Sequence, residues 1–380
     1  MSSAKSPFLL RIMRMLLAVA AGLLLLAVLV GYWLWQQYRD FGQTVLLPPQ
    51  AAAETVIIAP GSSYVGMVRQ VGAMTEIASD IPAAWLWRLH GRLQQPLIRA
   101  GEYRLQPGTT VADWLQQLQQ GAVVQHAITV VEGWTSAEII ARLRQHALLD
   151  TAVLASPPTV LQQHLLKATD SPLLQQAQQV VQQRQLDQRA LLEGMLLPET
   201  YYYARGESAL ALLQRMHQAL LEVTMNAWSD YLHRNPDASA RNLRSPYELV
   251  ILASIIEKET AVAAERGQIA GVFHRRLQQG MLLQTDPTVI YGLGAAYDGN
   301  IRRRDLSTDH AYNTYTRKGL PPAPIANPGA DAIRAAANPQ PGDTLYFVAS
   351  GDGGHVFSTT LAEHQRAVQA YLRKLREQRQ

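Results

Sequence analysis

An uninterrupted apolar run is the strongest pattern along this chain, because residues 15–38 contain no charged side chain. About 20 apolar residues are enough for a helix to span a bilayer. The run therefore predicts a transmembrane helix at 15–38, preceded by a short N-terminal segment at 1–14. A cleaved signal peptide is the alternative, but its apolar region would be shorter and would end in a small-residue cleavage site.

The residues that flank this helix predict its orientation. Lys5, Arg11 and Arg14 precede it, and four tyrosine or tryptophan residues lie between positions 32 and 38. Basic residues concentrate on the cytoplasmic side of membrane proteins, and aromatic residues concentrate at the membrane surfaces. We therefore expect the N-terminus in the cytoplasm and the rest of the chain across the membrane.

Short strand-like and helical runs alternate after a stretch at 39–51, which is rich in Pro, Gln and Ala and is predicted to be a linker. The strand-like runs stand at 54–58, 101–105 and 127–131, and the helical runs at 81–89 and 110–118, the second of them closed by Gly121. Strands and helices in this order and at this spacing predict a small α+β module at 52–131.

The rest of the chain divides into a helical region and a mixed region. Residues 132–189 are mostly helical, and their Gln-rich part at 175–188 keeps apolar residues at intervals, as a solvated helix does. From 190 to 380, helical runs alternate with loop-rich stretches at 283–292 and 311–322, a hairpin at 344–358 and a final helix from about 361. Three tyrosines at 201–203 fit either core packing or the wall of a sugar-binding cleft.

A helix with a clear start signal, at 245–260, dominates the mixed region. Ser245 can cap it, Pro246 suits its first turn, and Glu248 completes a capping box three residues after the cap. Apolar residues follow at helical intervals, at positions 251, 252, 255, 256, 262 and 263. At roughly 100° per residue, these positions share one face, and Glu259 lies in the middle of it.

Glu259 is the unusual residue of this helix, because a carboxyl group on an apolar face loses its hydration. Desolvation disfavours the charged form and raises the pKa, as a general acid that works near neutral pH requires. The alternative is a side chain that reaches solvent or pairs with Arg266 or Arg275. Glu257 points to the opposite side of the helix and is not expected to take part in catalysis.

Composition narrows the classes of function. The chain has 380 residues, a formal net charge of +4 and no cysteine, which excludes disulfides, thiolate catalysis and cysteine-ligated metals. It carries no Lys/Arg block or other nucleic-acid-binding pattern. The histidines, His355 among them, lack the spacing of a metal site and are expected to be packing or surface residues. No Walker or GxSxG motif is present, and we predict neither a metal nor a cofactor.

Four motifs follow one another in the second half of the chain. They are Ala-Ser-Ile-Ile-Glu-Lys-Glu-Thr at 253–260, Leu-Gln-Thr-Asp-Pro-Thr-Val-Ile-Tyr-Gly at 283–292, Tyr-Asn-Thr-Tyr at 312–315 and Gly-Leu-Pro-Pro at 319–322. In sequence and in order, they resemble the MltG/YceG-like family of endolytic murein transglycosylases. The resemblance covers essentially the whole chain. One departure is Leu197 before Pro198, where family members often have an aromatic residue.

This resemblance implies an α+β protein of the bacterial inner membrane, with its catalytic part in the periplasm. A LysM-like module would occupy 52–131, a helical connecting region 132–189, and a catalytic transglycosylase domain, built around a buried Glu-bearing helix, 190–380. The family activity implies cleavage of the β-1,4 bond between N-acetylmuramic acid and N-acetylglucosamine in nascent glycan strands. The products would carry 1,6-anhydro ends, and the cleavage would limit glycan chain length.

The resemblance also suggests roles for single residues. The catalytic Glu of the family maps to Glu259. Candidates for orienting the sugar and its N-acetyl groups come from the same motifs: Thr260, Gln284, Asp286, Tyr312, Asn313 and Tyr315. Hydrogen bonds that stabilise the loops are the alternative role for each of them. Penicillin-binding proteins are the partners that the family implies.

Two other functions remain open at the level of sequence. A non-catalytic wall-binding scaffold would need residues 52–131 but not the carboxyl group of Glu259. A glycoside hydrolase with a water nucleophile would need a second carboxylate, Asp286 or Glu257, that faces Glu259 across the cleft.

Overall fold

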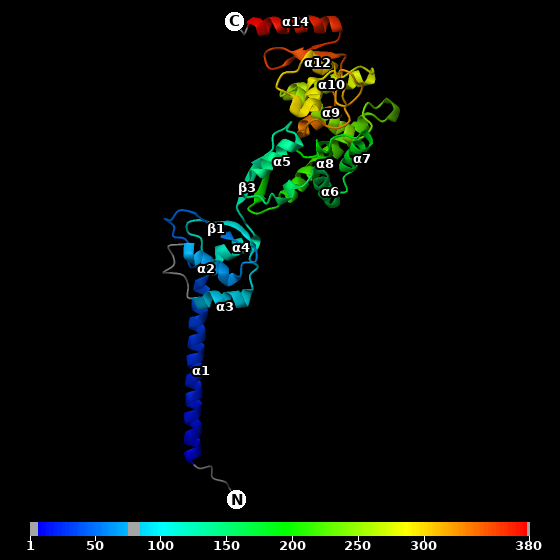
Figure 1. Cartoon of the computed structure of the whole chain (residues 1–380). Helices are drawn as coiled ribbons and strands as arrows, with labels where there is room; N and C mark the ends of the chain where they lie inside the picture. The colour runs from blue at the N-terminus through cyan, green and yellow to red at the C-terminus, as the bar shows by residue number, and fades with distance from the viewer. Residues whose placement is uncertain (1–6, 75–83, 378–380) are drawn as a thin grey trace. The chain divides into compact units, whose positions relative to one another are not determined.

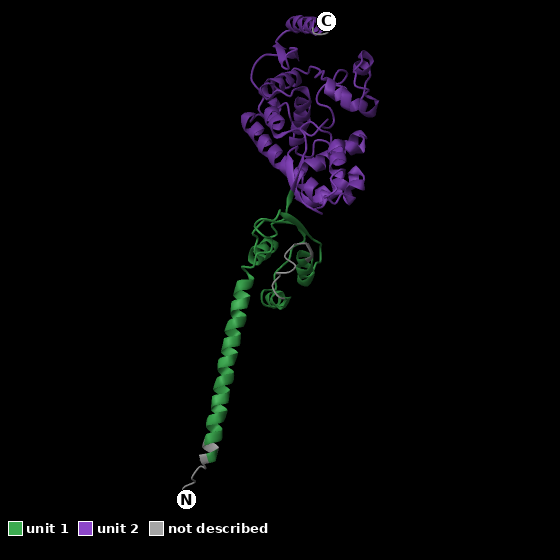
Figure 2. Ribbon diagram, turned by 90° about the vertical axis from the view of Figure 1, so that its left-hand side faces the viewer, with its two compact units in different colours: residues 1–125 green, residues 126–380 purple. Residues whose placement is uncertain are grey.

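The computed structural model describes residues 7–74 and 84–377, which form a mixed α+β protein of two compact units (Figures 1 and 2). The first unit spans residues 1–125 and the second spans residues 126–380. Lys5, which contributes to the predicted membrane orientation, lies outside the described residues, as does the start of the helix predicted at 81–89. The finer predicted division of the chain stays a prediction.

Helix α1, Pro7–Phe41, begins the first unit (Figure 1). Its part from Arg11 to Phe41 is long and apolar enough to cross a membrane. Large apolar side chains such as those of Leu24 and Leu25 are more than half exposed along it, as lipid-facing residues would be. The helix is thus compatible with the single-pass anchor predicted at 15–38, and its orientation stays a prediction.

The rest of the first unit is a small α+β body. Strand β1, Glu54–Ile58, pairs antiparallel with β2, Gly101–Leu105, and three helices accompany them: α2, Tyr64–Met74, α3, Ala84–Gln94, and α4, Val111–Gln120. A capping box between Thr110 and Asp113 begins α4, and Gly121 ends it in the left-handed conformation. Leu46 and Leu47, from the stretch predicted to be a linker, are buried in the core of this unit.

The second unit consists of helices with two short pairs of strands. Its elements are β3, Gln125–Thr129, α5, Ser136–Arg144, α6, Pro158–Ala168, α7, Pro172–Arg184, β4, Thr200–Ala204, α8, Ala209–Arg234, α9, Pro246–Glu259, α10, Arg266–Gln278, α11, Asp286–Leu293, α12, Arg303–Ser307, α13, Ala330–Ala337, β5, Tyr346–Ala349, β6, His355–Ser358, and α14, Leu361–Glu377. Strand β3 pairs with β4, and β5 pairs antiparallel with β6. The predicted hairpin and final helix are thereby confirmed.

Helix α9 lies in the core of the second unit, where α7, α8, α10, α11 and α13 contact it. All eight residues from Leu249 to Ile256 are at most 3% exposed. A helix that is apolar on every side is buried on every side. The prediction of a single apolar face on this helix is therefore wrong, because the side that carries Glu257 is also covered by protein.

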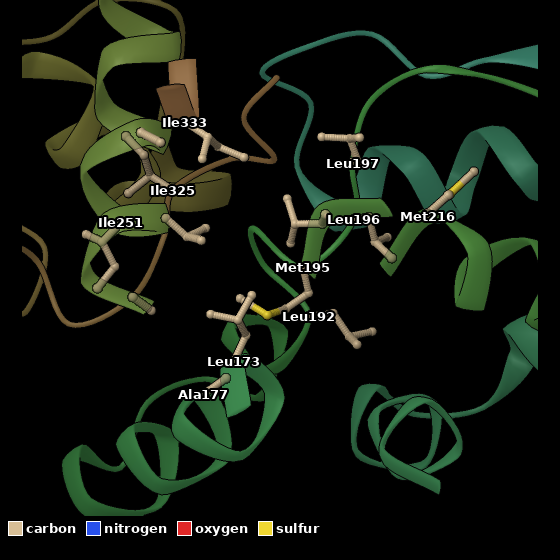
Figure 3. Close-up of a cluster of buried hydrophobic side chains, with 14 of the residues drawn as sticks. Leu173, Ala177, Leu192, Met195, Leu196, Leu197, Met216, Ile251, Ile325 and Ile333 are labelled. Atoms are coloured by element: carbon tan, nitrogen blue, oxygen red, sulfur yellow. The ribbon is translucent and has the colours of Figure 1, made fainter. Parts of the chain in front are cut away.

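Gly194 allows the segment Leu192–Leu197 to approach the chain near Pro324. Its φ is +73°, and a Cβ atom at this position would lie 2.5 Å from the Cβ atom of Pro324. Glycine is the residue that meets both conditions without strain. The segment contributes buried side chains to the core that also contains Ile251, among them Leu192, Met195, Leu196 and Leu197 (Figure 3).

Three elements differ from the expectation based on sequence. Residues 286–293 form α11, although the stretch 283–292 was predicted to be loop-rich. Asp286 and Pro287 supply an ordinary helix start. Val262 and Ala263 do not continue the central helix, because α9 ends at Glu259 and the next residue has extended backbone. Helix α8, 26 residues long, was not predicted at all.

Candidate active site

Glu259 is the last residue of α9, where the helix reaches a pocket. The residue is half-buried, while protein atoms surround its carboxyl group. Burial removes water from the charged form and raises the pKa of Glu259 to about 7. The hydroxyl of Thr285, which donates a hydrogen bond to Oε1, opposes this rise, and the charge of Asp286 adds to it. A carboxyl group of this pKa is partly protonated near neutral pH, as a general acid must be.

Two other buried threonines hold Thr285 in place. Its backbone N–H donates to Oγ1 of Thr314 at 3.1 Å, and Oγ1 of Thr288 donates to its carbonyl oxygen at 2.8 Å. The side chains of all three threonines are at most 2% exposed, so the donor to Glu259 is oriented before any ligand binds. Sequence reasoning missed these three residues, although they lie within motifs that it singled out.

A pocket of about 440 Å³ opens beside Glu259. Its lining includes three of the six predicted substrate-binding residues, Gln284, Asp286 and Tyr315, and further residues of α10, β5, β6 and α14. The structure therefore brings together residues from the motifs at 253–260, 283–292 and 312–315. Segments from the C-terminal 35 residues, which carried no site prediction, complete the pocket.

Gln284, Asp286 and Tyr315 are fixed by local contacts. Gln284 has a φ of +51°, a conformation that is rare for residues other than glycine and that often marks a functional position. Its backbone N–H donates to the carbonyl oxygen of Thr314 at 3.1 Å. The hydroxyl of Tyr315 donates to Oδ1 of Asp286 at 2.5 Å. The side chains of Asp286 and Tyr315, which this contact orients, are suited to binding sugar hydroxyl and amide groups.

Arg276, which had no predicted role, supplies a positive charge to the pocket. Its guanidinium group donates to the carbonyl oxygens of Leu345 and Leu283, each at 2.7 Å, and lies 5.2 Å from the ring centre of Tyr346. The side chain thereby joins α10 to the segment that leads into β5. It also favours the charged form of Glu259 through space.

His355 lines the pocket, although it was expected to be a packing or surface residue. Its backbone N–H donates to Oε1 of Glu265 at 2.9 Å, and its Nδ1 lies 2.7 Å from Oε2 of the same carboxylate. This double contact fixes the start of β6 against the turn that precedes α10. Sequence could not reveal it, because the two residues are 90 positions apart.

Glu257 lies in a different environment from Glu259. Its Oε1 is 3.2 Å from Nη2 of Arg266, and its side chain is 6% exposed. Burial raises its pKa, whereas Arg266 opposes the rise. Arg275, the other cation considered as a partner for Glu259, instead binds Thr344. Within the described part of the chain, neither arginine forms an ion pair with Glu259.

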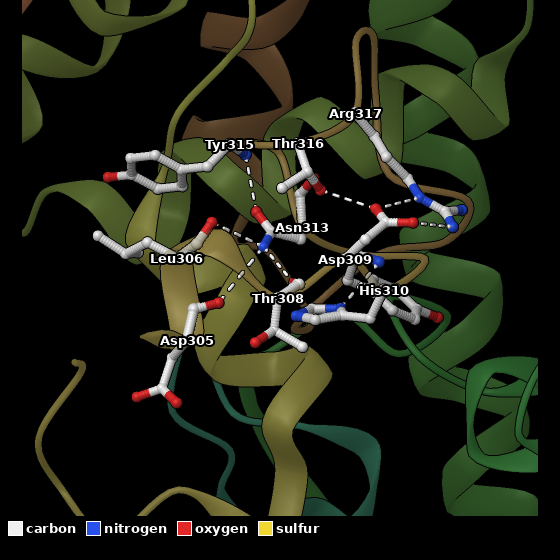
Figure 4. A network of polar contacts seen from close by, with 10 residues as sticks. Asp305, Leu306, Thr308, Asp309, His310, Asn313, Tyr315, Thr316 and Arg317 are labelled. Atoms are coloured by element: carbon white, nitrogen blue, oxygen red, sulfur yellow. Dashed lines mark hydrogen bonds and ion pairs between the residues drawn. The ribbon is translucent and has the colours of Figure 1, made fainter. Parts of the chain in front are cut away.

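Asn313 stabilises the loop that carries Tyr315. It is fully buried, and its Nδ2 donates to the carbonyl oxygens of Asp305, Leu306 and Thr308 at 2.7 to 3.3 Å (Figure 4). Its Oδ1 accepts a hydrogen bond from the backbone N–H of Tyr315 at 2.8 Å. With all of these contacts inside the loop, Asn313 is placed to position Tyr315 rather than to reach the pocket.

Thr260 and Tyr312 also lie outside the pocket lining. Oγ1 of Thr260 accepts a hydrogen bond from the backbone N–H of Val262, and the ring of Tyr312 packs against that of Tyr291 with centroids 4.9 Å apart. The tyrosine run at 201–203 fits the core alternative, because its first and third members are buried and the second is exposed. Among residues 7–74 and 84–377, no cluster suited to a metal ion occurs.

Comparison with known proteins identifies the family. A family model described as the YceG-like family matches residues 56–370, a range that contains every residue of the pocket. The chain belongs to the YceG-like family. The resemblance noted from the four motifs is thereby confirmed.

Relatives of this YceG-like chain include proteins with an assigned activity. An endolytic murein transglycosylase of Bacillus subtilis strain 168 is 29% identical over 351 residues, which cover 87% of this chain and 89% of the relative. One of Streptococcus pneumoniae serotype 2 is 28% identical over 361 residues, which cover 89% of this chain and 62% of the relative. The crystal structure of a YceG-like protein from Listeria monocytogenes is 29% identical, covers 83% of this chain and 98% of that one, and has a TM-score of 0.47.

Proposed function

We propose that this protein is an endolytic murein transglycosylase, a lyase that cleaves the glycan strands of peptidoglycan. The observation that carries the proposal is the enclosed carboxyl group of Glu259, which has a pKa of about 7 and stands beside a pocket of polar and aromatic side chains. The activity named for the Bacillus and Streptococcus relatives supports it.

Glu259 acts first as an acid and then as a base. Its proton moves to the glycosidic oxygen between N-acetylmuramic acid and N-acetylglucosamine while the bond from that oxygen to C1 of the muramic residue breaks. The resulting carboxylate then takes the proton of the 6-hydroxyl of the same muramic residue, whose oxygen bonds to C1. The product ends in a 1,6-anhydro ring, no water is consumed, and Glu259 regains its proton.

Neighbouring groups orient Glu259 and the sugar. The hydrogen bond from Thr285 occupies Oε1. Among the described residues Oε2 has no hydrogen-bond partner, so this oxygen is the one that carries both proton transfers. The Asp286 carboxylate lies in the pocket where positive charge develops on the sugar in the transition state. Gln284 and Tyr315 supply further polar groups for the sugar substituents.

Mass spectrometry of the products tests the reaction and the acid together. Full-length protein in detergent is incubated with purified peptidoglycan beside the Glu259→Gln variant, which keeps the side-chain shape but has no proton to transfer. We expect 1,6-anhydromuramic ends from the wild type and at least a hundredfold fewer from the variant. Equal product from both proteins would contradict the assignment of Glu259, and no cleavage by either would favour a wall-binding scaffold.

A water-using glycoside hydrolase is the second candidate, because Asp286 lines the same pocket as Glu259. A retaining or inverting hydrolase needs two carboxyl groups on either side of the bond. Glu257 does not supply the second one, since it is closed off by Arg266. Reducing-end sugars in the mass spectra, and equal losses of activity in Glu259→Gln and Asp286→Asn, would establish the hydrolase.

The first unit anchors the enzyme and presents it to its substrate. We propose that α1 spans the inner membrane with its N-terminus in the cytoplasm and that the catalytic unit works in the periplasm. Residues 52–131 act as a LysM-like module that holds glycan strands, and peptidoglycan synthases of the penicillin-binding class are the partners. Cleavage of strands as they emerge from these synthases would limit their length. Failure of the full-length protein to crosslink to any synthase in cells would overturn the partner proposal.

A further inference from the structure

A second pocket, of about 320 Å³, adjoins the first turns of α9, at the end of the helix remote from Glu259. The last turns of α7, the segment 242–244, the first turns of α9 and the Gly-Leu-Pro-Pro motif at 319–322 line this α9 N-terminal pocket. The motif does not line the pocket beside Glu259. Its position indicates that this loop serves another site on the second unit.

Two arginines give this pocket a positive charge. Arg184 and Arg244 both line it and are exposed, and within the described part of the chain neither guanidinium group has a hydrogen-bond or ion-pair partner. Asn242 and Glu248 are further polar lining groups, and the Glu248 carboxylate accepts a hydrogen bond from the backbone N–H of Arg244 at 2.7 Å. The two arginines outweigh the single carboxylate, and guanidinium groups are the natural partners of carboxylates and phosphates.

Helix geometry relates this pocket to the catalytic one. Glu248 and Glu259 are eleven residues apart, which at about 100° and 1.5 Å per residue places them within about 20° around α9 and about 16 Å apart along it. Both pockets therefore adjoin nearly the same side of one helix. The helix between the pockets is buried, so a long polymer that is cut at Glu259 reaches the α9 N-terminal pocket over the elements that cover α9, and not along the helix itself.

One loop forms a wall of both pockets. Tyr315 lies in the catalytic pocket, and residues 319–322 lie in the α9 N-terminal pocket. Between them, Arg317 binds Asp309 through two contacts, Nε to Oδ1 at 2.8 Å and Nη2 to Oδ2 at 2.9 Å (Figure 4). This pair and the hydrogen bonds of Asn313 lie within the loop that links the two pockets.

We propose that the α9 N-terminal pocket binds the carboxylates of the peptide side chains that murein strands carry on their muramic residues. This inference rests on the proposed function and extends it to the substrate, because it makes peptide-bearing strands the preferred form over strands without peptides. Arg184 and Arg244 bind a peptide carboxylate on a muramic residue remote from the scissile bond. They therefore contribute to strand binding and not to the bond-breaking step.

The test compares two substrates that differ only in the peptides. Fluorescently labelled glycan strands are prepared with their peptides, or after an amidase has removed them, and are given to full-length protein in detergent. For Arg184→Gln/Arg244→Gln we expect KM and Kd for peptide-bearing strands to rise about tenfold, which corresponds to about 1.4 kcal/mol. We expect kcat to stay the same, and both constants for peptide-free strands to stay the same. The matched control is Arg142→Gln, an exposed arginine of α5 outside the pocket.

The outcomes separate the subsite from the proposed function. An equal rise on both substrates, or no rise on either, overturns the peptide subsite. Fluorescence anisotropy measures Kd whether or not the strands are cleaved. A protein that binds both substrates and cuts neither would therefore refute the proposed function, and the Kd values would still test whether the two arginines bind the peptides. A Tm of the double variant within about 2 °C of the wild-type Tm would show that the fold is intact. If the double variant unfolds earlier, Arg244→Lys and Arg184→Lys replace it, because they keep the charge and lose the bidentate geometry.

Discussion

Single side chains set the acidity of the candidate catalytic group. Opposing effects act on the pKa of Glu259: burial and the charge of Asp286 raise it, and the hydrogen bond from the hydroxyl of Thr285 lowers it. The balance near pH 7 keeps both forms accessible, as a group that gives and later takes a proton requires. We therefore propose Thr285 as a positioning residue that acts through Glu259.

Replacing Thr285 with valine tests this role. The hydrogen bond favours the charged form of Glu259, so its loss raises the pKa of Glu259. The alkaline limb of the pH–rate profile then shifts to higher pH by about one pH unit or more. We expect kcat to fall and KM to change little. Thr285→Ser keeps the hydroxyl group, and we expect it to have the wild-type kcat and the wild-type position of the alkaline limb. A valine variant with an unchanged alkaline limb would show that Thr285 only supports the fold.

At the scale of the element, α9 presents two glutamates with separate tasks. Glu257 binds Arg266, which also contacts Glu132 at 3.1 Å, so this side of the helix ties α9 to α10 and to the chain before α5. Glu259, two residues later, opens onto the pocket. Because successive residues on a helix differ by about 100°, two positions are enough to send one carboxyl to a cation and the other to a site.

Parallel substitutions separate these two tasks. Glu257→Gln leaves the charge of Arg266 buried with weaker partners, and we expect it to lower the free energy of unfolding by about 3 kcal/mol or somewhat less, with kcat nearly unchanged. Glu259→Gln should abolish activity and leave the free energy of unfolding unchanged or slightly higher at pH 8. Denaturant unfolding and product assays on both variants test these roles. Loss of activity in Glu257→Gln with loss of stability in Glu259→Gln would refute them.

At the scale of the whole molecule, another buried carboxyl group, that of Glu193, joins distant segments of the second unit. Oε1 of Glu193 accepts hydrogen bonds from the backbone N–H of Ser136 at 2.9 Å and from Nδ2 of Asn327 at 3.3 Å, and Oε2 accepts one from the hydroxyl of Tyr291 at 3.2 Å. Burial raises the pKa of Glu193 to about 7, and the contact with Ser136 opposes the rise. This group lies outside the catalytic pocket, so its acidity concerns the stability of the fold.

Glu193 makes the stability of the protein depend on pH. The folded protein keeps its proton up to about pH 7, whereas the unfolded chain loses it near the ordinary pKa of 4.5. Unfolding therefore releases a proton between these values, and the stabilising contribution of this group falls as the pH rises through this window. We expect the unfolding free energy to fall less between pH 5 and pH 8 in Glu193→Gln than in the wild type, by up to about 3 kcal/mol. Identical pH dependences in variant and wild type would rule out this role.

Much of the local structure follows from sequence because it depends on neighbours in the chain. Several features rest on residues within a few positions of one another: the apolar run of α1, the strands β1 and β2, the helix α4 with Gly121 after it, and the start of α9 at Ser245. The same local reasoning singled out Glu259 as a carboxyl group among apolar side chains. It failed for α11, where a Thr-Asp-Pro start was interpreted as a loop, and for the second buried face of α9.

Only the tertiary structure decided which polar groups meet. Such contacts join residues far apart in the chain, and they leave no periodic pattern in the sequence from which they could be predicted. Thr285, Arg276 and His355 reach the surroundings of Glu259 through packing of separate elements. Within the single motif 312–315, Asn313 turns into the loop and Tyr315 faces the pocket. The sequence by itself indicated a carboxyl group among the apolar side chains of a helix. The packing of other elements determined that this group stands at the helix end and what surrounds it, because a pocket forms only where distant segments leave space between them.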